Sequence, residues 1–274
     1  MATTPPAGPR ESDAPEPRAE SARAGELRLC GLTAVRARFA REPGSIKRLY
    51  FDRETGRKIG VICRVLARDR KIYRQVEPAE LEKIAGSVHH GGVVAVTTLP
   101  TLKQPSSSDV AAWARRGESL LVLDRIGNAH NLGAIARTAA FFGVPRIVIP
   151  DDPSAARPND AAYRVAEGGF ESLEVWRVAR LPEFLPALAE AGYEVVGAAT
   201  RGGALGGRAG GGTGARPKPV ALVLGNEEEG LSQEAAKACT RLVTIPGSGL
   251  VESLNVSVAG AVLMWELLRR SGRA

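Results

Sequence analysis

Short apolar runs, rich in β-branched residues, recur through the C-terminal half of this chain at the length of β-strands. Six such runs occupy residues 120–123, 147–149, 173–178, 195–199, 220–224 and 242–245. Stretches with helical spacing separate most of them, at residues 132–142, 181–191 and 234–240, and a longer one covers residues 254–269. This alternation predicts an α/β fold whose parallel sheet is covered by helices on both faces.

A smaller set of elements precedes these, between residues 27 and 99. The pattern predicts a helix over residues 29–40, strands over 46–51, 72–76 and 93–96, and a short helix over 80–84 after Pro78. The apolar residues 61–66 fit a helix or a strand. Residues 100–108 are polar and proline-containing, which is typical of a linker. We therefore predict a small α/β domain at residues 26–100, a linker at 101–117 and a larger α/β domain at 118–274.

Two segments lack the pattern of a packed domain. Residues 1–25 are rich in proline and contain no aromatic residue, which predicts a disordered tail. Residues 202–214 are dense in glycine, and the prolines that follow do not begin the helix that a phosphate-binding loop requires. We interpret residues 202–214 as a flexible insert, either a lid over a neighbouring site or a tolerated insertion.

Composition narrows the class of protein. Hydrophobic residues make up 44% of the chain and charged residues 24%, as in an ordinary globular protein. No uncharged apolar stretch approaches the roughly 18 residues of a membrane span, and the N-terminus lacks the apolar core of a secretory signal. We therefore expect a cytoplasmic protein without membrane contact. Three scattered cysteines and three histidines are too few for a disulfide framework or a metal site, so we expect no metal.

The net charge of +7 is carried mostly by arginine. The planar guanidinium group suits phosphate and the faces of nucleobases, which indicates a polyanionic partner. A GC-rich genome also enriches arginine, so composition alone leaves both explanations open.

Polar residues and glycines gather in three segments that follow predicted strands, which is where parallel sheets bind ligands. In the first, Asn131 is placed to cap the next helix, and Gly133 allows a close backbone approach. Arg137 lies among small apolar residues and must reach a partner or solvent. A structural salt bridge or a surface position explains Arg137 as well as a functional role does.

The second segment follows the strand at residues 220–224. Gly225 lies where this strand ends, Glu227 lies in the loop, and Gly230 closes it. An acidic, glycine-containing loop favours a ligand that is cationic or rich in hydroxyl and amino groups. A plain acidic turn before a helix capped by Ser232 is the alternative.

The third segment begins at Ile245 and Pro246. Ser253, Asn255 and Ser257 open an otherwise apolar helix, whose free backbone N–H groups favour anions or polar ligand atoms. Ordinary capping by Ser253 is the alternative.

Together the three segments closely resemble the motifs of one protein family. The motifs read Asn131-x-Gly133-x-x-x-Arg137-Thr138-Ala139, Leu224-Gly225-Asn226-Glu227-x-x-Gly230, and Ile245-Pro246 followed by Ser253-Leu254-Asn255-Val256-Ser257. Over residues 118–270 the chain resembles the SpoU (TrmH-type) RNA 2′-O-ribose methyltransferases of the SPOUT superfamily. The N-terminal unit resembles the L30e-like RNA-binding domain of many members, with Gly91 where they usually have glutamine after the motif histidine, here His90.

This resemblance implies the fold, the reaction and the site. The fold is a parallel sheet with a C-terminal trefoil knot, in a homodimer, and the reaction transfers a methyl group from S-adenosylmethionine (SAM) to a ribose 2′-OH of rRNA or tRNA. The cofactor-binding residues implied are Thr200, Leu224, Gly225, Ile245 and Leu254. The catalytic residues implied are Asn131, Arg137, Glu227, Ser253 and Asn255. Arg137 is either a base or a group that stabilises charge, and the second role fits a side chain that stays protonated.

Two other functions compete with this one. A catalytically silent RNA-binding or ribosome-assembly factor on the same scaffold would be free to lose the five catalytic residues, and the chain has all five. A dinucleotide-binding enzyme would need Gly-x-Gly-x-x-Gly between its first strand and helix, which is absent.

Overall fold

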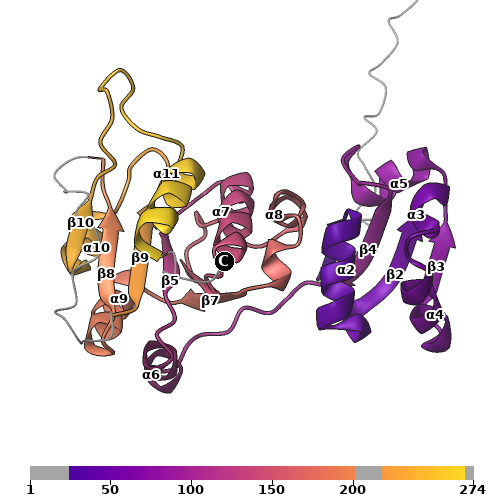
Figure 1. The fold of residues 1–274 in the computed structure, drawn as a ribbon, viewed down its shortest axis with the longest axis horizontal. Helices are drawn as coiled ribbons and strands as arrows, with labels where there is room; N and C mark the ends of the chain where they lie inside the picture. Colours follow the sequence, from indigo (N-terminus) through magenta and orange to yellow (C-terminus); the bar gives the residue numbers. More distant parts are fainter. Residues whose placement is uncertain (1–24, 201–217, 269–274) are drawn as a thin grey trace, which may run out of the picture.

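The computed structural model describes residues 25–200 and 218–268, which form two α/β units, each with its own sheet (Figure 1). The predicted tail, except Gly25, lies outside the described residues. So do the insert at residues 202–214 and the last residue of the long helix predicted over residues 254–269.

The N-terminal unit is a four-stranded sheet with the strand order β1-β4-β2-β3. Strands β1 (Glu26–Cys30) and β2 (Ile46–Phe51) pair antiparallel with β4 (Val93–Thr98), and β3 (Ile72–Gln75) pairs parallel with β2. Its helical segments are α2 (Leu32–Arg41), η1 (Pro43–Ser45), α3 (Arg53–Gly56), α4 (Gly60–Arg68) and α5 (Pro78–Ala85). Leu27, Leu29, Ile46 and Leu49 are fully buried in its core.

For this unit, the structure corrects the start of one predicted helix and decides between helix and strand for one ambiguous run. The helix predicted over residues 29–40 is wrong at its start, because Leu29 and Cys30 belong to β1, and Gly31, at a φ of 90°, separates the strand from α2. The ambiguous run at residues 61–66 is helical and lies within α4.

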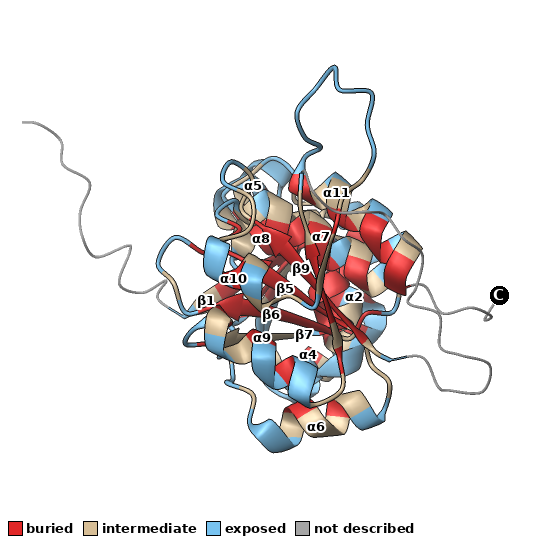
Figure 2. Cartoon of the chain, turned by 90° about the vertical axis from the view of Figure 1, so that its left-hand side faces the viewer, coloured by how far each residue is buried: buried red, intermediate tan, exposed pale blue. Residues whose placement is uncertain are grey.

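The C-terminal unit is a six-stranded sheet with the order β10-β8-β9-β5-β6-β7, and every neighbouring pair is parallel. Its strands are β5 (Leu120–Asp124), β6 (Arg146–Pro150), β7 (Glu174–Val178), β8 (Glu194–Ala198), β9 (Val220–Gly225) and β10 (Arg241–Val243). They correspond to the six apolar runs, so the predicted parallel sheet is confirmed. Figure 2 shows these buried strands between two layers of helices.

Alternate strand residues face the two helical layers. One layer contains α7 (Ala129–Phe141), α8 (Asp160–Ala166), the short η2 (Gly169–Glu171) and α11 (Val256–Leu263), which continues as a π-helical turn, η3 (Met264–Leu268). Leu121, Leu123, Leu222 and Leu224 pack against this layer. The other layer contains α6 (Ser107–Arg115), α9 (Leu181–Glu190) and α10 (Gln233–Ala238), on Leu120, Val122, Ala221 and Val223. Burial on both faces explains why each strand is apolar throughout.

The segment predicted as a linker, residues 101–117, contains helix α6. Ser106 caps it, since its hydroxyl accepts from the backbone N–H of Asp109 and the Asp109 carboxylate accepts from that of Ser106. Trp113 on this helix is buried against the sheet. The helix stabilises the larger unit, so only the part before Ser106 connects the two units.

The described residues contain no helix that is long and apolar enough to cross a membrane. Between residues 25 and 200 and between 218 and 268, no group of three or more His, Cys, Asp or Glu side chains could hold a metal ion.

Candidate active site

A cavity of about 570 Å³ lies at the carboxyl ends of β8 and β9. Three loops line it, those after β8, β9 and β10, together with the start of α11. All five predicted cofactor-binding residues contribute to its wall, namely Thr200, Leu224, Gly225, Ile245 and Leu254. The volume falls within the range of small-molecule sites, roughly 300–1,000 Å³.

The wall of this cavity has two kinds of surface. Apolar side chains come from Leu224, Ile245, Leu254 and Leu263, and acidic ones come from the loop of Glu227, Glu228 and Glu229 and from Glu252. Such a wall fits a ligand that has an apolar ring system and a cationic part.

Gly225 lets the acidic loop fold back on the end of β9. A Cβ atom at Gly225 would lie 2.2 Å from the carbonyl carbon of Gly230 and 2.3 Å from the nitrogen of Leu231, so no larger residue fits. Asn226 and Gly230 exchange two backbone hydrogen bonds of 2.9 Å, which close the loop. The amide of Asn226 also donates to the carbonyl of Arg125 over 2.8 Å, which ties the loop to the end of β5.

Asn131 does not cap helix α7, contrary to the sequence prediction. Asn128 caps it, accepting from the backbone N–H of His130 at 2.8 Å, because the helix begins at Ala129. The side chain of Asn131 is instead free to bond across the site. Its Nδ2 donates to Oε1 of Glu227 at 2.7 Å, and its Oδ1 accepts from Nδ2 of Asn255 at 3.1 Å.

Three predicted catalytic residues therefore form one hydrogen-bonded chain, Asn255–Asn131–Glu227. They come from three segments of the sequence, the starts of α11 and α7 and the loop after β9. Asn255 also caps α11 by accepting from the backbone N–H of Ser257 at 2.9 Å, so the proposed capping by Ser253 is wrong. Ser253 is exposed and lines the cavity.

Arg137 is exposed on α7 and forms an ion pair with Glu167 at 2.9 Å, with 57% and 58% of the two side chains exposed. The structure thus places Arg137 at the surface, as the structural alternative expected. It shows no hydrogen bond or ion pair from Arg137 to the Asn255–Asn131–Glu227 chain within the described part of the protein.

The sequence did not single out Asp124, at the end of β5, or Glu167, the ion-pair partner of Arg137. Asp124 is 3% exposed, and its Oδ2 accepts from the backbone N–H of Ser232 at 2.6 Å, which fixes the start of α10. Its signal in the sequence was an acid that directly ends an apolar strand. Glu167 had no local signal, because its partner Arg137 lies on another helix. Ser232 caps α10, as the alternative for the second segment expected.

The backbone at Gly91 explains why glycine follows His90 in the motif of the N-terminal unit. Gly91 has a φ of 56°, and a Cβ atom there would lie 3.1 Å from the Cα atom of Gly31. Nδ1 of His90 accepts from the backbone N–H of Gly92 at 3.1 Å. The left-handed backbone and the close approach both favour glycine at position 91 over glutamine.

Comparison with known proteins matches both units. Residues 118–265 match the SpoU rRNA Methylase family, and residues 28–102 match the RNA 2′-O ribose methyltransferase substrate binding domain. A 23S rRNA (guanosine-2′-O-)-methyltransferase RlmB of Nitrosomonas europaea is 32% identical over 88% of this chain and 91% of its own. An uncharacterized tRNA/rRNA methyltransferase YfiF of Escherichia coli O157:H7 is 34% identical over 91% of this chain and 70% of its own.

Solved structures agree with these sequence matches. A putative RNA methyltransferase of the TrmH family from Porphyromonas gingivalis has a TM-score of 0.68 and 26% identity, and the match covers 93% of this chain and 94% of that one. The SpoU methyltransferase AviRb from Streptomyces viridochromogenes, in complex with the cofactor AdoMet, has a TM-score of 0.64 and 25% identity over 92% of both chains.

Proposed function

The chain belongs to the SpoU rRNA methylase family of SAM-dependent RNA 2′-O-methyltransferases, and on that premise we propose that the cavity, the Asn255–Asn131–Glu227 chain and Arg137 form one active site. The observation that carries this proposal is the hydrogen bonding of Asn131 to both Glu227 and Asn255 beside the cavity. A silent RNA-binding factor would not need this arrangement.

The cavity fits SAM. The apolar side chains of Leu224, Ile245 and Leu254 suit an adenine ring, and the neighbouring acids suit a sulfonium and an ammonium group. When bound, SAM supplies an electrophilic methyl carbon. Gly225 lets the acidic loop close against the end of β9, which keeps the acids of that loop beside the cavity.

The protein's own part in the reaction is to orient the ribose and to stabilise charge. A 2′-hydroxyl must lie in line with the methyl carbon. As the new O–C bond forms, the bond from that methyl group to sulfur would break and the hydroxyl proton would pass to solvent water. Arg137 remains protonated and donates to the developing negative charge on the 2′-oxygen. Asn131, held by Glu227 and Asn255, and Ser253 at the rim orient the ribose hydroxyls.

We take the substrate to be ribosomal RNA. The relative from Nitrosomonas europaea, which matches most of both chains, is named for 23S rRNA, and residues 28–102 match a substrate-binding domain. In this division, residues 26–100 bind RNA and residues 118–274 carry out the transfer. With this substrate, we propose a cytoplasmic location.

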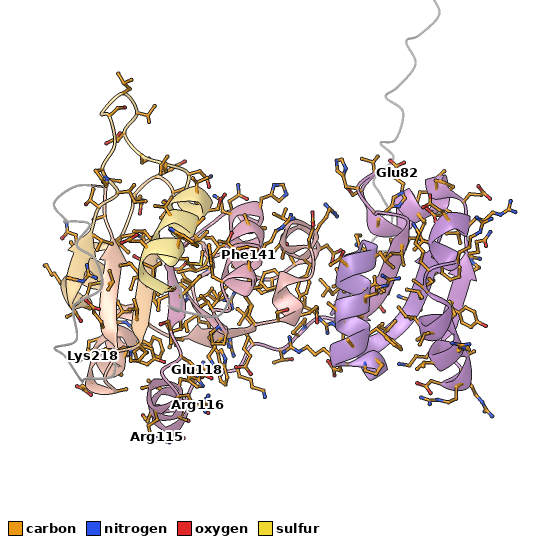
Figure 3. All side chains as sticks on the ribbon, viewed as in Figure 1. Glu82, Arg115, Arg116, Glu118, Phe141 and Lys218 are labelled. Carbon is orange, nitrogen blue, oxygen red and sulfur yellow. The ribbon has the colours of Figure 1, made fainter. Side chains whose placement is uncertain are left out.

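We also propose a homodimer. Val258, Val262 and Trp265 form an exposed apolar stripe on α11 and η3, and Phe141 on α7, labelled in Figure 3, is 83% exposed. Phe142 links these parts, because its ring contacts those of both Phe141 and Trp265. An apolar surface of this kind is typical of an interface. Val258→Glu should convert the dimer to a monomer in light scattering, and an unchanged mass would contradict the proposed interface.

The family also implies a trefoil knot in the C-terminal part of the sheet. In support, β9 lies between β8 and β5, and α11 returns to pack on α7 and β9.

The experiment that tests the function compares 2′-O-methyl positions in total RNA from cells with and without the gene. We expect one ribose of ribosomal RNA to lose its methyl group when the gene is removed. Loss of a methyl group in transfer RNA alone would overturn the substrate, and an unchanged map with no SAM binding by calorimetry would overturn the enzymatic function.

A further inference from the structure

The segment of residues 167–171, here termed the connector, lies between the N-terminal unit and the helix that carries Arg137. On one side, a Cβ atom at Gly168 would lie 3.4 Å from the Cα atom of Ala34 on α2. On the other side, a Cβ atom at Gly169 would lie 2.9 Å from the Cα atom of Arg137 on α7. The connector therefore touches the backbone of both helices, with no side chain in between.

Two arginines on helix α2 of the N-terminal unit bind the connector. Arg38 forms an ion pair with Glu171 at 2.8 Å, and only 6% and 2% of the two side chains are exposed. Burial raises the pKa of the Glu171 carboxyl, while the positive charge of Arg38 opposes the rise. A buried pair of this kind is costly to break by removing one partner, which makes the docked arrangement specific.

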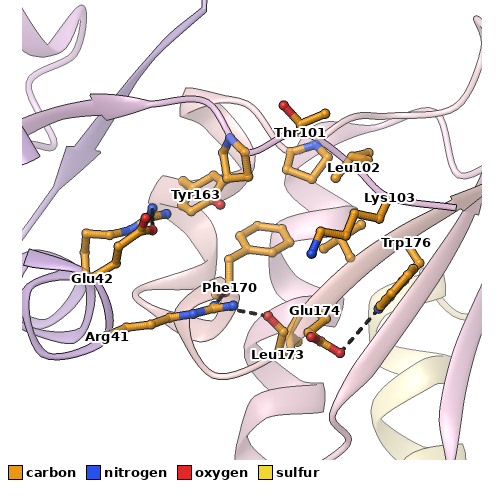
Figure 4. Close-up of a pocket in the computed structure, with 14 residues that line it drawn as sticks. Arg41, Glu42, Thr101, Leu102, Lys103, Tyr163, Phe170, Leu173, Glu174 and Trp176 are labelled. Carbon is orange, nitrogen blue, oxygen red and sulfur yellow. Dashed lines mark hydrogen bonds and ion pairs between the residues drawn. The ribbon is translucent and has the colours of Figure 1, made fainter. Parts of the chain in front are cut away.

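The second arginine, Arg41, holds the backbone of the connector. Its Nη1 donates to the carbonyl oxygens of Phe170 at 3.0 Å and Glu171 at 3.1 Å. It also reaches the carbonyl of Leu173 at 3.4 Å, the contact drawn in Figure 4 beside a cavity of about 190 Å³ at this junction. A third contact, from Arg28 to Asp160 at 2.8 Å, fixes the start of α8, the helix that leads into the connector.

Glu167, the first residue of the connector, has a left-handed backbone with φ and ψ both 44°. A residue other than glycine is strained in this left-handed conformation, so the surrounding contacts must hold the backbone in place. The carboxylate of Glu167 is the ion-pair partner of Arg137. Because both side chains are more than half exposed, this pair contributes little to stability, and its effect is to orient the guanidinium group.

We propose that Glu167 is a positioning residue for Arg137, and that the docked N-terminal unit holds Glu167 in place through the connector. The unit that binds RNA thereby sets the orientation of the arginine that acts at the ribose. This inference rests on the proposed function, because the role of Arg137 is assigned there.

The first test is Glu167→Gly in the full-length protein. Glycine adopts the left-handed conformation without strain, so the melting temperature should stay the same or rise. The loss of the carboxylate should lower kcat for RNA methylation about tenfold, since misplaced groups cost rate steeply. KM for RNA and the Kd for SAM should stay within about twofold. A merely structural role would lower stability and activity together.

The matched control is Glu183→Gln, which removes the carboxylate from another exposed ion pair, Arg180–Glu183, with 69% of each side chain exposed. This pair lies at the start of α9, in the helical layer on the other face of the sheet. Glu183→Gln should leave kcat unchanged. If Glu167→Gly keeps the wild-type kcat, or if Glu183→Gln lowers kcat as much as Glu167→Gly does, Glu167 is not a positioning residue.

The second test is a double-mutant cycle between Arg41→Gln and Glu167→Gly. Arg41→Gln alone should lower kcat severalfold by loosening the connector, and it should have no further effect on kcat once Glu167 is glycine. Independent, multiplicative losses of kcat would overturn the coupling. Failure of the proposed function would be recognised by a different result, namely that the wild-type protein itself methylates no RNA.

Discussion

Oε1 of Glu227 accepts a hydrogen bond of 2.7 Å from the side-chain amide of Asn131, across 96 residues of sequence. The bond joins the first turn of α7 to the loop after β9, and the same amide group accepts from Asn255 at the start of α11. Glu227 also lines the cavity, so this relationship links the cofactor-sized cavity to the surface on which Arg137 lies.

Asn131→Asp tests the need for an amide in this chain. The change places a second carboxylate against Glu227, so at pH 8 methyl transfer should fall by about one to two orders of magnitude. Repulsion raises the pKa of the carboxyl pair, so a proton is shared as the pH falls towards 6, and part of the activity should return. The measurement is kcat against pH. Asn128→Asp on the same helix keeps a capping oxygen and should behave like wild type. Parallel pH profiles for Asn131→Asp and wild type would contradict this account.

Gly225→Ala tests whether the folded-back acidic loop is needed for SAM binding. The added methyl group would lie 2.2 Å from the carbonyl carbon of Gly230, so the loop must move away from the end of β9. Overpacking of this kind costs about 1–3 kcal/mol, which predicts a loss of SAM affinity of about tenfold or more by calorimetry. Gly247→Ala, at a position with nothing within 4 Å of the added Cβ, is the matched control. Equal affinities in the two variants would show that the loop does not shape the site.

Gly133→Ala tests the packing of α7 on α8. Its Cβ would lie 2.4 Å from the carbonyl oxygen of Ala162 and 2.9 Å from Cβ of Val165. The free energy of unfolding should fall by about 2 kcal/mol in urea titration. Gly60→Ala, in open space at the start of α4, should not destabilise the protein. A Gly133→Ala protein as stable as wild type would mean that α7 and α8 can separate without cost.

The reactivity of the Cys239 thiol tests how well the helical layer of α6, α9 and α10 is packed on the sheet. Burial raises the pKa of the Cys239 thiol to about 12, so almost none of it is thiolate at pH 8. Only the thiolate reacts with iodoacetamide, so Cys239 should alkylate on the order of a thousandfold more slowly than free cysteine. Mass spectrometry of the alkylated peptides measures this rate, with the urea-unfolded protein as control. Rapid labelling of Cys239 in the folded protein would contradict its environment near α10.

The sequence allowed the sheet of the larger unit to be predicted because each strand is apolar on both faces. Residues 220–224 carry no polar position, a pattern typical of a strand covered by helices on both faces. The same logic located the candidate site, since loops after parallel strands meet at one edge. All five predicted cofactor residues line the cavity there, and their binding of SAM remains a prediction.

Other features had no local signal. Asn128 and Asn131 are equally good caps by composition, and the choice depended on where α7 begins. Helices α6 and α8 contain only nine and seven residues, which is too short for a helical period to stand out in the sequence. The pairs Arg38–Glu171 and Arg137–Glu167 join residues from different elements, which periodicity along one segment cannot reveal.

The most direct test of the central claim is Arg137→Ala, assayed for both methyl transfer and SAM binding. With labelled SAM and ribosomal RNA, transfer should fall by about 100- to 1,000-fold, the range for removal of a group that stabilises developing charge. Calorimetry should give a Kd for SAM within about twofold of wild type, because Arg137 does not line the cavity. Methyl transfer near the wild-type rate in Arg137→Ala would contradict the assignment of this arginine and with it the proposed active site.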